Sequence, residues 1–353
     1  MKILIDRDNL QKALAVVARA VGKSNIPALN GVLLKTQDGH PVLTANNLET
    51  EIRGSCFAEV EGEGTVIVPA KFVDIVKVLP APDVAVSVDE LKLTVKSGDT
   101  TFVLHGMDAD EFPAPEYGEP KAQFTLSDLS KIVAKTLFAT DQADAADFKR
   151  GVLFWCKDGE LKCMATDTYR LVEYMTPIKV DYEFRFLLPG KSLATTAAVF
   201  GNKIIACSLY NNSVEFRDEI YSVTCRLFED RFPNFSSAWP QEHETTVTAP
   251  AEQLRESLSR AALVAGKNNT IKMSVEGNNL EISARSETGS MNERIDIEKT
   301  GEDVAAYWNV KFLLEGLRAS GEPTIHFNGE LGPAVMEAES HRYLVLPVKA
   351  ERW

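Results

Sequence analysis

The sequence predicts an α+β fold in which one kind of domain occurs three times along the 353-residue chain. The first observation is an interval, because Lys71, Lys191 and Lys311 follow one another at steps of 120 residues, within the similar segments VPAKF, LPGKS and WNVKF. The second is that Pro113 and Pro233, which end the motifs EFP and RFP, keep the same step. A repeat at a fixed period indicates one architecture used three times rather than three unrelated α+β domains.

Each third of the chain is predicted to contain two helices. The first helix of each third shows apolar residues at helical spacing, as in Leu10, Leu14 and Val17. The segments Ser127-Asp128 and Pro250 are typical helix starts. The six helices are predicted at residues 8–23, 70–79, 126–139, 189–203, 251–267 and 309–319.

Short alternating strands and tight turns fill the rest of each third. The stretches KTQDGHPV, CKDGELKC and VEGNNLEI have the composition of hairpin turns, for which Asp-Gly is the strongest signal. The dipeptides Asn30-Gly31 and Arg150-Gly151 open matching strands 120 residues apart. Each third therefore reads as strand, helix and three strands, repeated once, which makes two βαβββ units per domain.

Proline-rich segments divide the thirds. They lie at residues 112–122, FPAPEYGEPKA, and at residues 232–244, FPNFSSAWPQEHE. The expected domains are residues 1–119, 120–243 and 244–353.

Composition places the chain in the globular class, with 44% hydrophobic and 25% charged residues. No apolar run approaches the roughly 18 residues that cross a bilayer, so we expect a cytoplasmic protein with no membrane partner. The five cysteines are far apart and are expected to be reduced and buried. Cys156 and Cys163 have no nearby His or second Cys pair, which argues against a metal site; no cofactor is expected.

The charge is distributed unevenly. The whole chain carries −13, whereas the six predicted helices sum to +8 and the remainder to −21. A solvated face explains scattered lysines on any single helix, but six helices of the same sign favour one shared basic surface. The helical cations expected to form this basic surface are Lys12, Arg19, Lys71, Lys77, Lys131, Lys135, Lys191, Lys203, Arg255, Arg260 and Lys311.

Rotational symmetry suggests what such a surface encloses. Three similar domains in an arc close when a second copy joins them, which places twelve helices on the inside and the sheets outside. Axes about 9 Å apart and helices roughly 10 Å thick leave a hole of about 25 Å. A duplex of roughly 20 Å passes through it. Modest positive charge would hold phosphates without sequence preference.

The chain resembles the DNA polymerase III beta subunit family, the bacterial sliding clamps. The resemblance covers essentially the whole chain. It rests on the threefold repeat and on three segments: ATDTYRLVEYM (Ala165 to Met175), RFPNF (Arg231 to Phe235) and YLVLPVK (Tyr343 to Lys349).

The resemblance implies a hydrophobic groove between the second and third domains. In the family this groove captures short Gln- and Leu/Phe-containing peptides from the replicative polymerase, the clamp loader and repair proteins. By matching position it would be formed by Thr166, Thr168, Tyr169, Arg170, Leu171, Pro233, Ala238, Leu344, Leu346, Pro347 and Val348. Apolar side chains suit such a pocket, and Arg170 is expected to orient the peptide. The alternative is that Leu171, Leu344 and Leu346 are ordinary core residues of two strands.

The resemblance also implies further DNA contacts at Lys23, Lys149 and Arg150, and a head-to-tail homodimer. Phe102 and Leu104 would meet Leu263 and Val264 of the second copy. Phe102 and Leu104 alternate as in a half-buried strand, so packing within one chain is a competing explanation.

The sequence departs from the family pattern at three places. Lys149 stands where an apolar groove residue is common, Ser237 where an arginine is common, and the tail from Ala350 to Trp353 extends past the usual end. Trp353 is a candidate to fold back towards the groove. These departures bear on which peptide is preferred.

We therefore expect a non-enzymatic processivity factor that encircles duplex DNA as a dimer and tethers a polymerase. A phage or mobile-element clamp with other partners is one alternative. An enzyme using Asp141, Asp144 and Asp147 as metal ligands, or His105 and His326 as bases, is the other. Solvated loop charge explains the three aspartates better, and no phosphate-cradling Gly-rich motif is present.

Overall fold

The structure, a computed structural model, describes the chain except for Lys23, Ala114, Glu116, Gln142, Asp144, Ala145, Asp230 and residues 350–353. The predictions for Lys23, Asp144 and the tail therefore lie outside the described residues. The α+β prediction is confirmed, and the chain divides into two compact units. Unit 1 comprises Met1–Leu129 and Lys191–Leu227, and unit 2 comprises Ser130–Gly190 and Phe228–Trp353.

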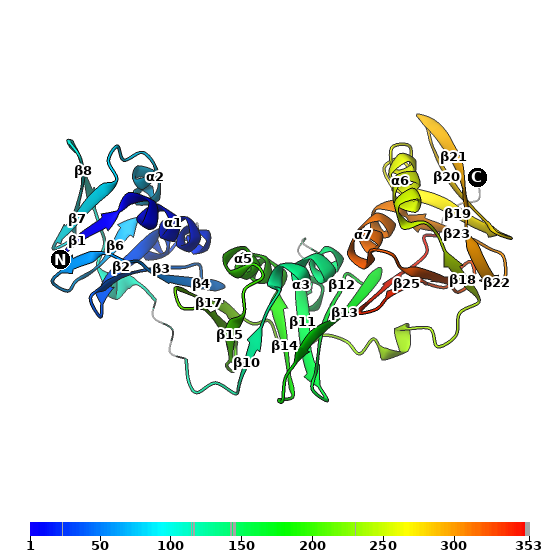
Figure 1. The fold of residues 1–353 in the computed structure, drawn as a ribbon, viewed down its shortest axis with the longest axis horizontal. Helices are drawn as coiled ribbons and strands as arrows, with labels where there is room; N and C mark the ends of the chain where they lie inside the picture. Colours follow the sequence, from blue (N-terminus) through cyan, green and yellow to red (C-terminus); the bar gives the residue numbers. More distant parts are fainter. Residues whose placement is uncertain are drawn as a thin grey trace. The chain divides into compact units, whose positions relative to one another are not determined.

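Unit 1 contains two antiparallel sheets, in the orders β5-β1-β7-β8-β9 and β10-β15-β16-β17-β4-β3-β2-β6. Helices α1 and α2 pack against each other, and α1 also packs on β3 and β4 (Figure 1). The elements are β1 (Lys2–Asp6), α1 (Arg7–Val17), β2 (Gly31–Gln37), β3 (His40–Asn46), β4 (Thr50–Ser55), β5 (Glu59–Glu61), β6 (Thr65–Pro69), α2 (Lys71–Lys77), β7 (Asp83–Asp89), β8 (Lys92–Ser97), β9 (Thr100–His105), β10 (Ala122–Leu126), α5 (Gly190–Phe200), β15 (Ile205–Leu209), β16 (Ser213–Arg217) and β17 (Tyr221–Arg226).

Unit 2 also contains two sheets, in the orders β14-β11-β12-β13-β26-β25-β24-β18-β22 and β21-β20-β19-β23. Helices α6 and α7 pack against each other, α6 on β20 and β21 and α7 on β25 and β26. The elements are α3 (Leu129–Thr136), α4 (Asp147–Arg150), β11 (Gly151–Lys157), β12 (Glu160–Thr166), β13 (Arg170–Lys179), β14 (Phe184–Pro189), β18 (Thr245–Thr248), α6 (Ala251–Ala262), β19 (Thr270–Glu276), β20 (Asn279–Ser286), β21 (Gly289–Asp296), β22 (Glu298–Gly301), β23 (Val304–Asn309), α7 (Val310–Ser320), β24 (Thr324–Phe327), β25 (Ala334–Ala338) and β26 (His341–Val345).

The repeated lysine segments occupy the same place in each βαβββ pair. The strand that leads into the helix pairs with the strand that begins at a glycine. Gly31 lies opposite Pro69, and Gly151 lies opposite Pro189. A Cβ at Gly31 would lie 2.6 Å from the Val68 carbonyl oxygen, and one at Gly151 would lie 2.8 Å from Leu187. The glycines therefore permit close strand approach, which explains why this landmark repeats.

The six predicted helices are confirmed as α1, α2, α3, α5, α6 and α7, and most end earlier than the pattern predicted. The Asp6 carboxylate caps α1 by accepting from the Asn9 N–H at 2.9 Å, and the Asn309 side chain caps α7. After α6, Gly266 adopts φ +67°, which a right-handed helix cannot contain. The residues after Ala262 therefore form turns rather than another helical turn.

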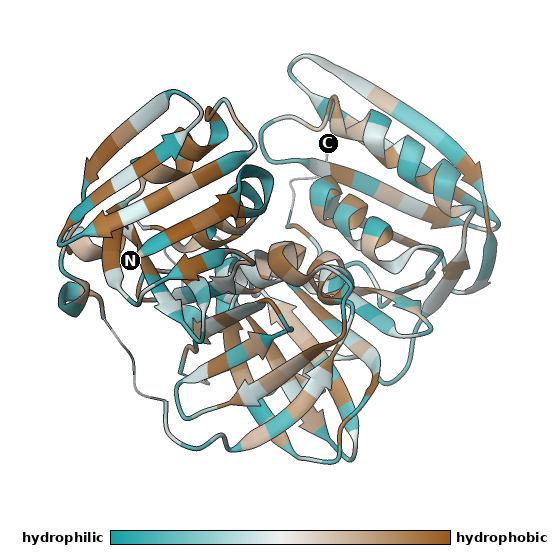
Figure 2. Cartoon of the chain, turned by 60° about the vertical axis from the view of Figure 1, so that its left-hand side comes forward, coloured by the Kyte–Doolittle hydropathy of each residue, from teal (hydrophilic) through white to brown (hydrophobic). Residues whose placement is uncertain are grey.

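The helices are amphipathic, as Figure 2 shows by alternating hydrophilic and hydrophobic residues along them. In α6, Leu254, Leu258 and Ala261 are buried at helical spacing. The turns at Asp38-Gly39 and Asp158-Gly159 have positive φ at both residues, as type I′ hairpins require. Among the described helices, none is long and apolar enough to cross a membrane.

Candidate functional site

The segment ATDTYRL forms a rigid turn between β12 and β13 in unit 2. The Thr166 hydroxyl donates to the Arg170 carbonyl at 2.6 Å and accepts from the Thr168 N–H at 3.0 Å. The Asp167 carboxylate accepts from the Tyr169 and Arg170 N–H groups at 2.9 and 3.0 Å. These bonds hold Thr168 at φ +79° and leave Tyr169 64% exposed. The turn therefore presents Tyr169 to a ligand while Thr166 stays buried.

Arg170 is held inside unit 2. Its guanidinium pairs with Asp167 at 2.8 Å and with Glu315, and it donates to the Phe138 carbonyl. It also lies 4.1 Å from the centroid of the Phe312 ring. The side chain is only 8% exposed, and its contacts tie the turn to α7.

The end of β26 runs alongside this turn. Leu344 pairs with Leu171 across the two strands, and the Leu346 N–H donates to the Tyr169 carbonyl at 2.9 Å. The Val348 N–H donates to the Tyr307 carbonyl at 2.8 Å. These bonds fix the segment after β26, and Leu346 stays 40% exposed.

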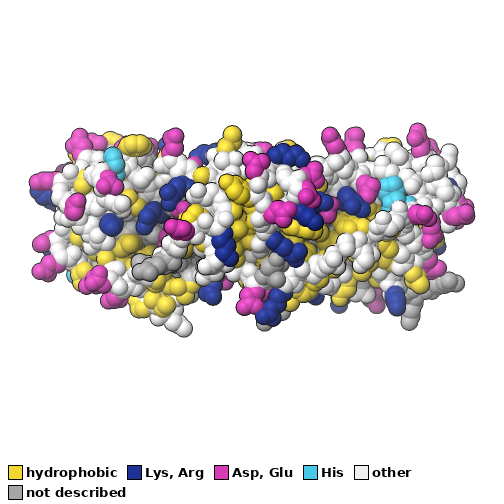
Figure 3. Space-filling view, turned by 90° about the horizontal axis from the view of Figure 1, so that it is seen from below, with side chains coloured by type: hydrophobic (Ala, Val, Ile, Leu, Met, Phe, Trp, Pro, Cys, Tyr) yellow, Lys and Arg dark blue, Asp and Glu magenta, His cyan; other side chains and the backbone are white. Residues whose placement is uncertain are grey.

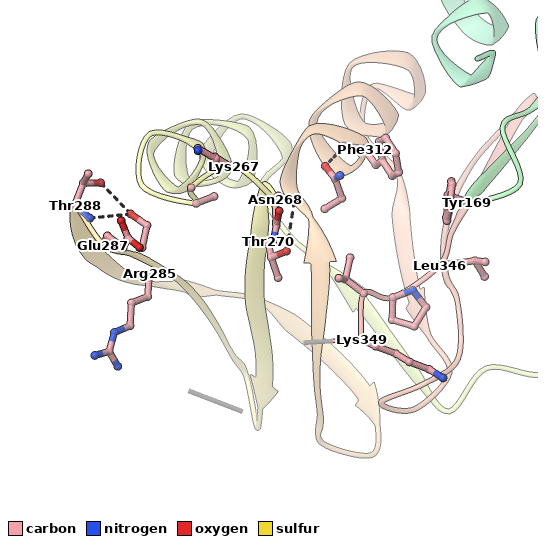
Figure 4. Close-up of a pocket in the computed structure, with 16 residues that line it drawn as sticks. Tyr169, Lys267, Asn268, Thr270, Arg285, Glu287, Thr288, Phe312, Leu346 and Lys349 are labelled. Carbon is pink, nitrogen blue, oxygen red and sulfur yellow. Dashed lines mark hydrogen bonds between the residues drawn. The ribbon is translucent and has the colours of Figure 1, made fainter. Parts of the chain in front are cut away.

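An open cavity of about 1140 Å³ lies beside this segment, within unit 2. Tyr169, Phe312 and Leu346 line one side of it together with Pro347, Val348 and Lys349, so this side is mostly apolar. Figure 4 shows Lys267, Arg285, Glu287 and Thr288 on the other side, which is polar and charged. A cavity with an apolar side and a polar side fits a short amphipathic ligand.

A hydrophobic cluster continues from the cavity along the same sheet. Leu171 and Leu344 are 2% and 4% exposed, and they pack with Phe232 and Trp239 from the segment that connects β17 to β18. Ala238 packs against this cluster and is half-buried. Exposed Pro233 lines a second cavity of about 790 Å³.

The predicted groove residues thus fall into adjacent groups. Tyr169, Leu346, Pro347 and Val348 share the first cavity, whereas Leu171, Leu344 and Ala238 belong to the cluster. The Lys149 ammonium lies 3.4 Å from the exposed Thr168 hydroxyl, at the edge of the same turn. The sequence analysis missed Phe312 and Trp239. Phe312 has the helical spacing of a core residue, and nothing in its local pattern marks it as a cavity residue.

Only some of the predicted DNA-facing side chains are exposed and lack an acidic partner among the described residues. Among the described residues, those that are exposed and make no hydrogen bond or ion pair are Lys12, Arg19, Lys71, Lys131, Lys191 and Lys311. Acidic neighbours hold others: Lys77 with Asp74, Lys203 with Asp218, Arg150 with Asp147, Arg255 with Glu252, and Arg260 with Glu256 and Glu293. Lys135 donates to the Ala319 carbonyl. Burial, and to a smaller extent the positive charge of Lys131, lowers the pKa of Lys135.

Two of the predicted contact residues of the dimer lie on a terminal strand, and the other two follow α6. β9 is the last strand of its sheet in unit 1, and its Phe102 and Leu104 are half-buried. β21 is likewise a terminal strand in unit 2. Leu263, just after α6, is 83% exposed, and Val264 is half-buried. Terminal strands offer unpaired N–H and C=O groups to another chain.

The residues of the enzyme alternative belong to separate parts of the chain, and Asp144 lies outside the described residues. Asp147 pairs with Arg150 at 2.6 Å, and His105 is exposed at the end of β9 in unit 1. His326 lies in β24 of unit 2, beside His243 and Glu337.

Comparison with known proteins assigns the family. Models of the DNA polymerase III beta subunit match in three parts: the N-terminal domain at residues 1–116, the central domain at 123–234 and the C-terminal domain at 236–348. The beta sliding clamp of Streptomyces coelicolor is 29% identical over 373 residues, and that of Staphylococcus epidermidis 28% identical over 376; each match covers 99% of both chains.

Solved structures agree with this assignment. The DNA polymerase III subunit beta from Pseudomonas aeruginosa has a TM-score of 0.95 at 26% identity, over 99% of this chain and 100% of that one. The DNA polymerase sliding clamp from Bacillus subtilis has a TM-score of 0.94 at 26% identity, with the same coverage. The repeat, the fold and the sequence matches thus agree along the length of the chain, which belongs to the DNA polymerase III beta subunit family of sliding clamps.

Proposed function

We propose that this protein is a processivity factor, a sliding clamp that encircles duplex DNA as a homodimer and tethers a replicative polymerase. The observation that carries the proposal is the match of all three family models, supported by the fold match to solved sliding clamps. The names of the matched relatives support this function rather than that of a phage or mobile-element clamp. We place the domains at residues 1–119, 120–243 and 244–353.

Tethering is assigned to the surface around Tyr169 and Leu346. An apolar side chain of a partner peptide can fill the space between Phe312 and Leu346, while the polar side of the cavity meets its backbone or a Gln side chain. Leu171 and Leu344 form the floor of the neighbouring cluster. Binding a flexible partner here raises its effective concentration at the DNA without any chemistry by the clamp.

We propose that the protein stays on DNA because two chains close into a ring around it. We propose that β9 of one copy meets the region of Leu263, Val264 and β21 of the other, because both are terminal strands with exposed apolar neighbours. The unpaired helical lysines, with Lys23 and Lys149, would face the phosphates. A ring is held by topology, so weak and sequence-independent phosphate contacts suffice.

Fluorescence anisotropy with a labelled C-terminal peptide of a bacterial replicative polymerase tests the tethering site. Leu346→Ala removes three apolar carbons from the cavity wall, about 1.5 kcal/mol of contact, and should weaken binding roughly tenfold. Leu331→Ala is the matched control, because Leu331 is 76% exposed and lines neither cavity. Equal affinity of the two variants for the peptide would reject this surface as the tether.

A further inference from the structure

Three potential metal ligands converge in unit 2, and two of them, His243 and Glu337, line the second cavity together with Pro233. His243 lies in the segment before β18, His326 in β24 and Glu337 in β25. One ligand atom from each residue lies within 4.8 Å of the other two. All three residues are half-buried. On the face drawn in Figure 3, histidine and hydrophobic side chains both reach the surface.

Hydrogen bonds fix which nitrogen of His243 carries a lone pair. The Asn328 amide nitrogen donates to the Pro333 carbonyl at 2.8 Å, so its Oδ1 must be the atom that faces His243. Oδ1 can only accept, and it lies 3.3 Å from His243 Nδ1, which therefore carries the proton. In the neutral ring with its proton on Nδ1, the lone pair that a metal ion needs is on Nε2.

His326 also makes a hydrogen bond through its Nδ1 atom. Its Nδ1 lies 3.0 Å from the Thr246 hydroxyl, which can accept, and its Nε2 lies 3.8 Å from Glu337 Oε2. The other carboxylate oxygen of Glu337, Oε1, accepts a hydrogen bond from the Arg342 Nε at 3.0 Å, so Oε2 remains available.

We propose that His243, His326 and Glu337 form a binding site for a divalent transition-metal ion such as Zn²⁺. Two imidazoles and one carboxylate are a typical ligand set for zinc, which leaves a fourth position for water. The rings are stacked 4.0 Å apart at 14°, so binding requires them to rotate until both Nε2 atoms point at one ion. Because zinc–nitrogen bonds are about 2.0–2.1 Å long, the ligand atoms must also draw closer together.

An ion at this position would fasten the segment before β18 to β24 and β25. That segment carries Pro233 and Ala238 as well as His243, so metal binding would stabilise one wall of the hydrophobic cluster. The proposal does not depend on the proposed function, since it rests on the ligand geometry alone.

Zinc titration of the full chain tests the site. ZnCl₂ is added in competition with a metallochromic indicator, and one ion per chain is expected. His243→Gln, His326→Gln and Glu337→Gln should each weaken binding at least about tenfold, and Thr246→Val should weaken it by a similar factor without removing a ligand. His40→Gln is the matched control, because His40 is exposed in a hairpin of unit 1.

Cobalt supplies a second readout that does not rely on variants. Co²⁺ bound by two imidazoles and a carboxylate should give visible absorption without the intense near-ultraviolet band of a cobalt–thiolate bond. The proposal is overturned if Zn²⁺ does not bind below about 1 mM, if the three ligand variants bind like His40→Gln, or if the thiolate band shows that cysteines hold the ion.

Discussion

Arg170 offers the sharpest test of how the tethering site is held together. Replacing it with Met keeps much of the apolar stem but leaves Asp167, which is 11% exposed, and Glu315, which is 39% exposed, without their cation. Breaking a buried ion pair costs about 3–5 kcal/mol. We take the lower end, about 3 kcal/mol, because solvent screens Glu315. Loss of the contact with the Phe312 ring adds to this cost.

The assay is urea unfolding of the full chain at pH 7, monitored through an optical signal that comes from unit 2. Arg342→Met is the matched control: Arg342 also pairs with a carboxylate and lies 4.3 Å over a ring, that of Trp239, but its side chain is 37% exposed. We expect it to cost less than about 1 kcal/mol. Adding Asp167→Asn to Arg170→Met should recover part of the loss, because the unpaired charge is removed. If Arg170→Met and Arg342→Met lower the free energy of unfolding equally, the buried network does not hold the turn.

Three further predictions concern pH, assembly and DNA. Burial lowers the pKa of His341 to about 4, below the 6.5 of the unfolded chain, so its contribution to stability is present above pH 6.5 and lost as the pH falls towards 4. The free energy of unfolding should drop by on the order of 3 kcal/mol over that range, and less in His341→Gln. Leu263→Asp should shift sedimentation from dimer to monomer, whereas Leu331→Asp should not; an unchanged dimer rejects the interface. Exchanging Lys12, Lys71 and Lys311 for Glu should weaken duplex binding at low salt and flatten its salt dependence. Lys77→Glu, at a lysine already paired with Asp74, should have a smaller effect, and equal effects would reject the basic surface.

The repeating elements could be predicted because their signals are local. Helical spacing in α1 and α6, and the Asp38-Gly39 and Asp158-Gly159 turns, depend on neighbours a few residues away. The 120-residue step added the long-range information that one architecture recurs. Helix ends were predicted less well: α1 changes to a 3₁₀ turn at Ala18, although residues up to 23 were predicted to be helical.

The candidate site could be predicted only through the family resemblance. Arg170 was expected to orient a peptide, but its partner Glu315 lies 145 residues away and no local pattern announces that pairing. Phe312 was also missed, because no local pattern shows that its ring lies beside Arg170. The cluster of His243, His326 and Glu337 combines three segments, and single histidines carry no signal until the sheet brings them together.

Retention on circular DNA tests the central claim most directly. The protein would be loaded onto a nicked circular plasmid by a bacterial clamp loader with ATP and passed through gel filtration in high salt. The account predicts that the clamp stays with the circle and is lost when a restriction enzyme linearises it, since a ring slides off an open end. Release from the intact circle by salt alone, or equal retention on circular and linear DNA, would show that affinity rather than topology holds the protein, and would contradict the account.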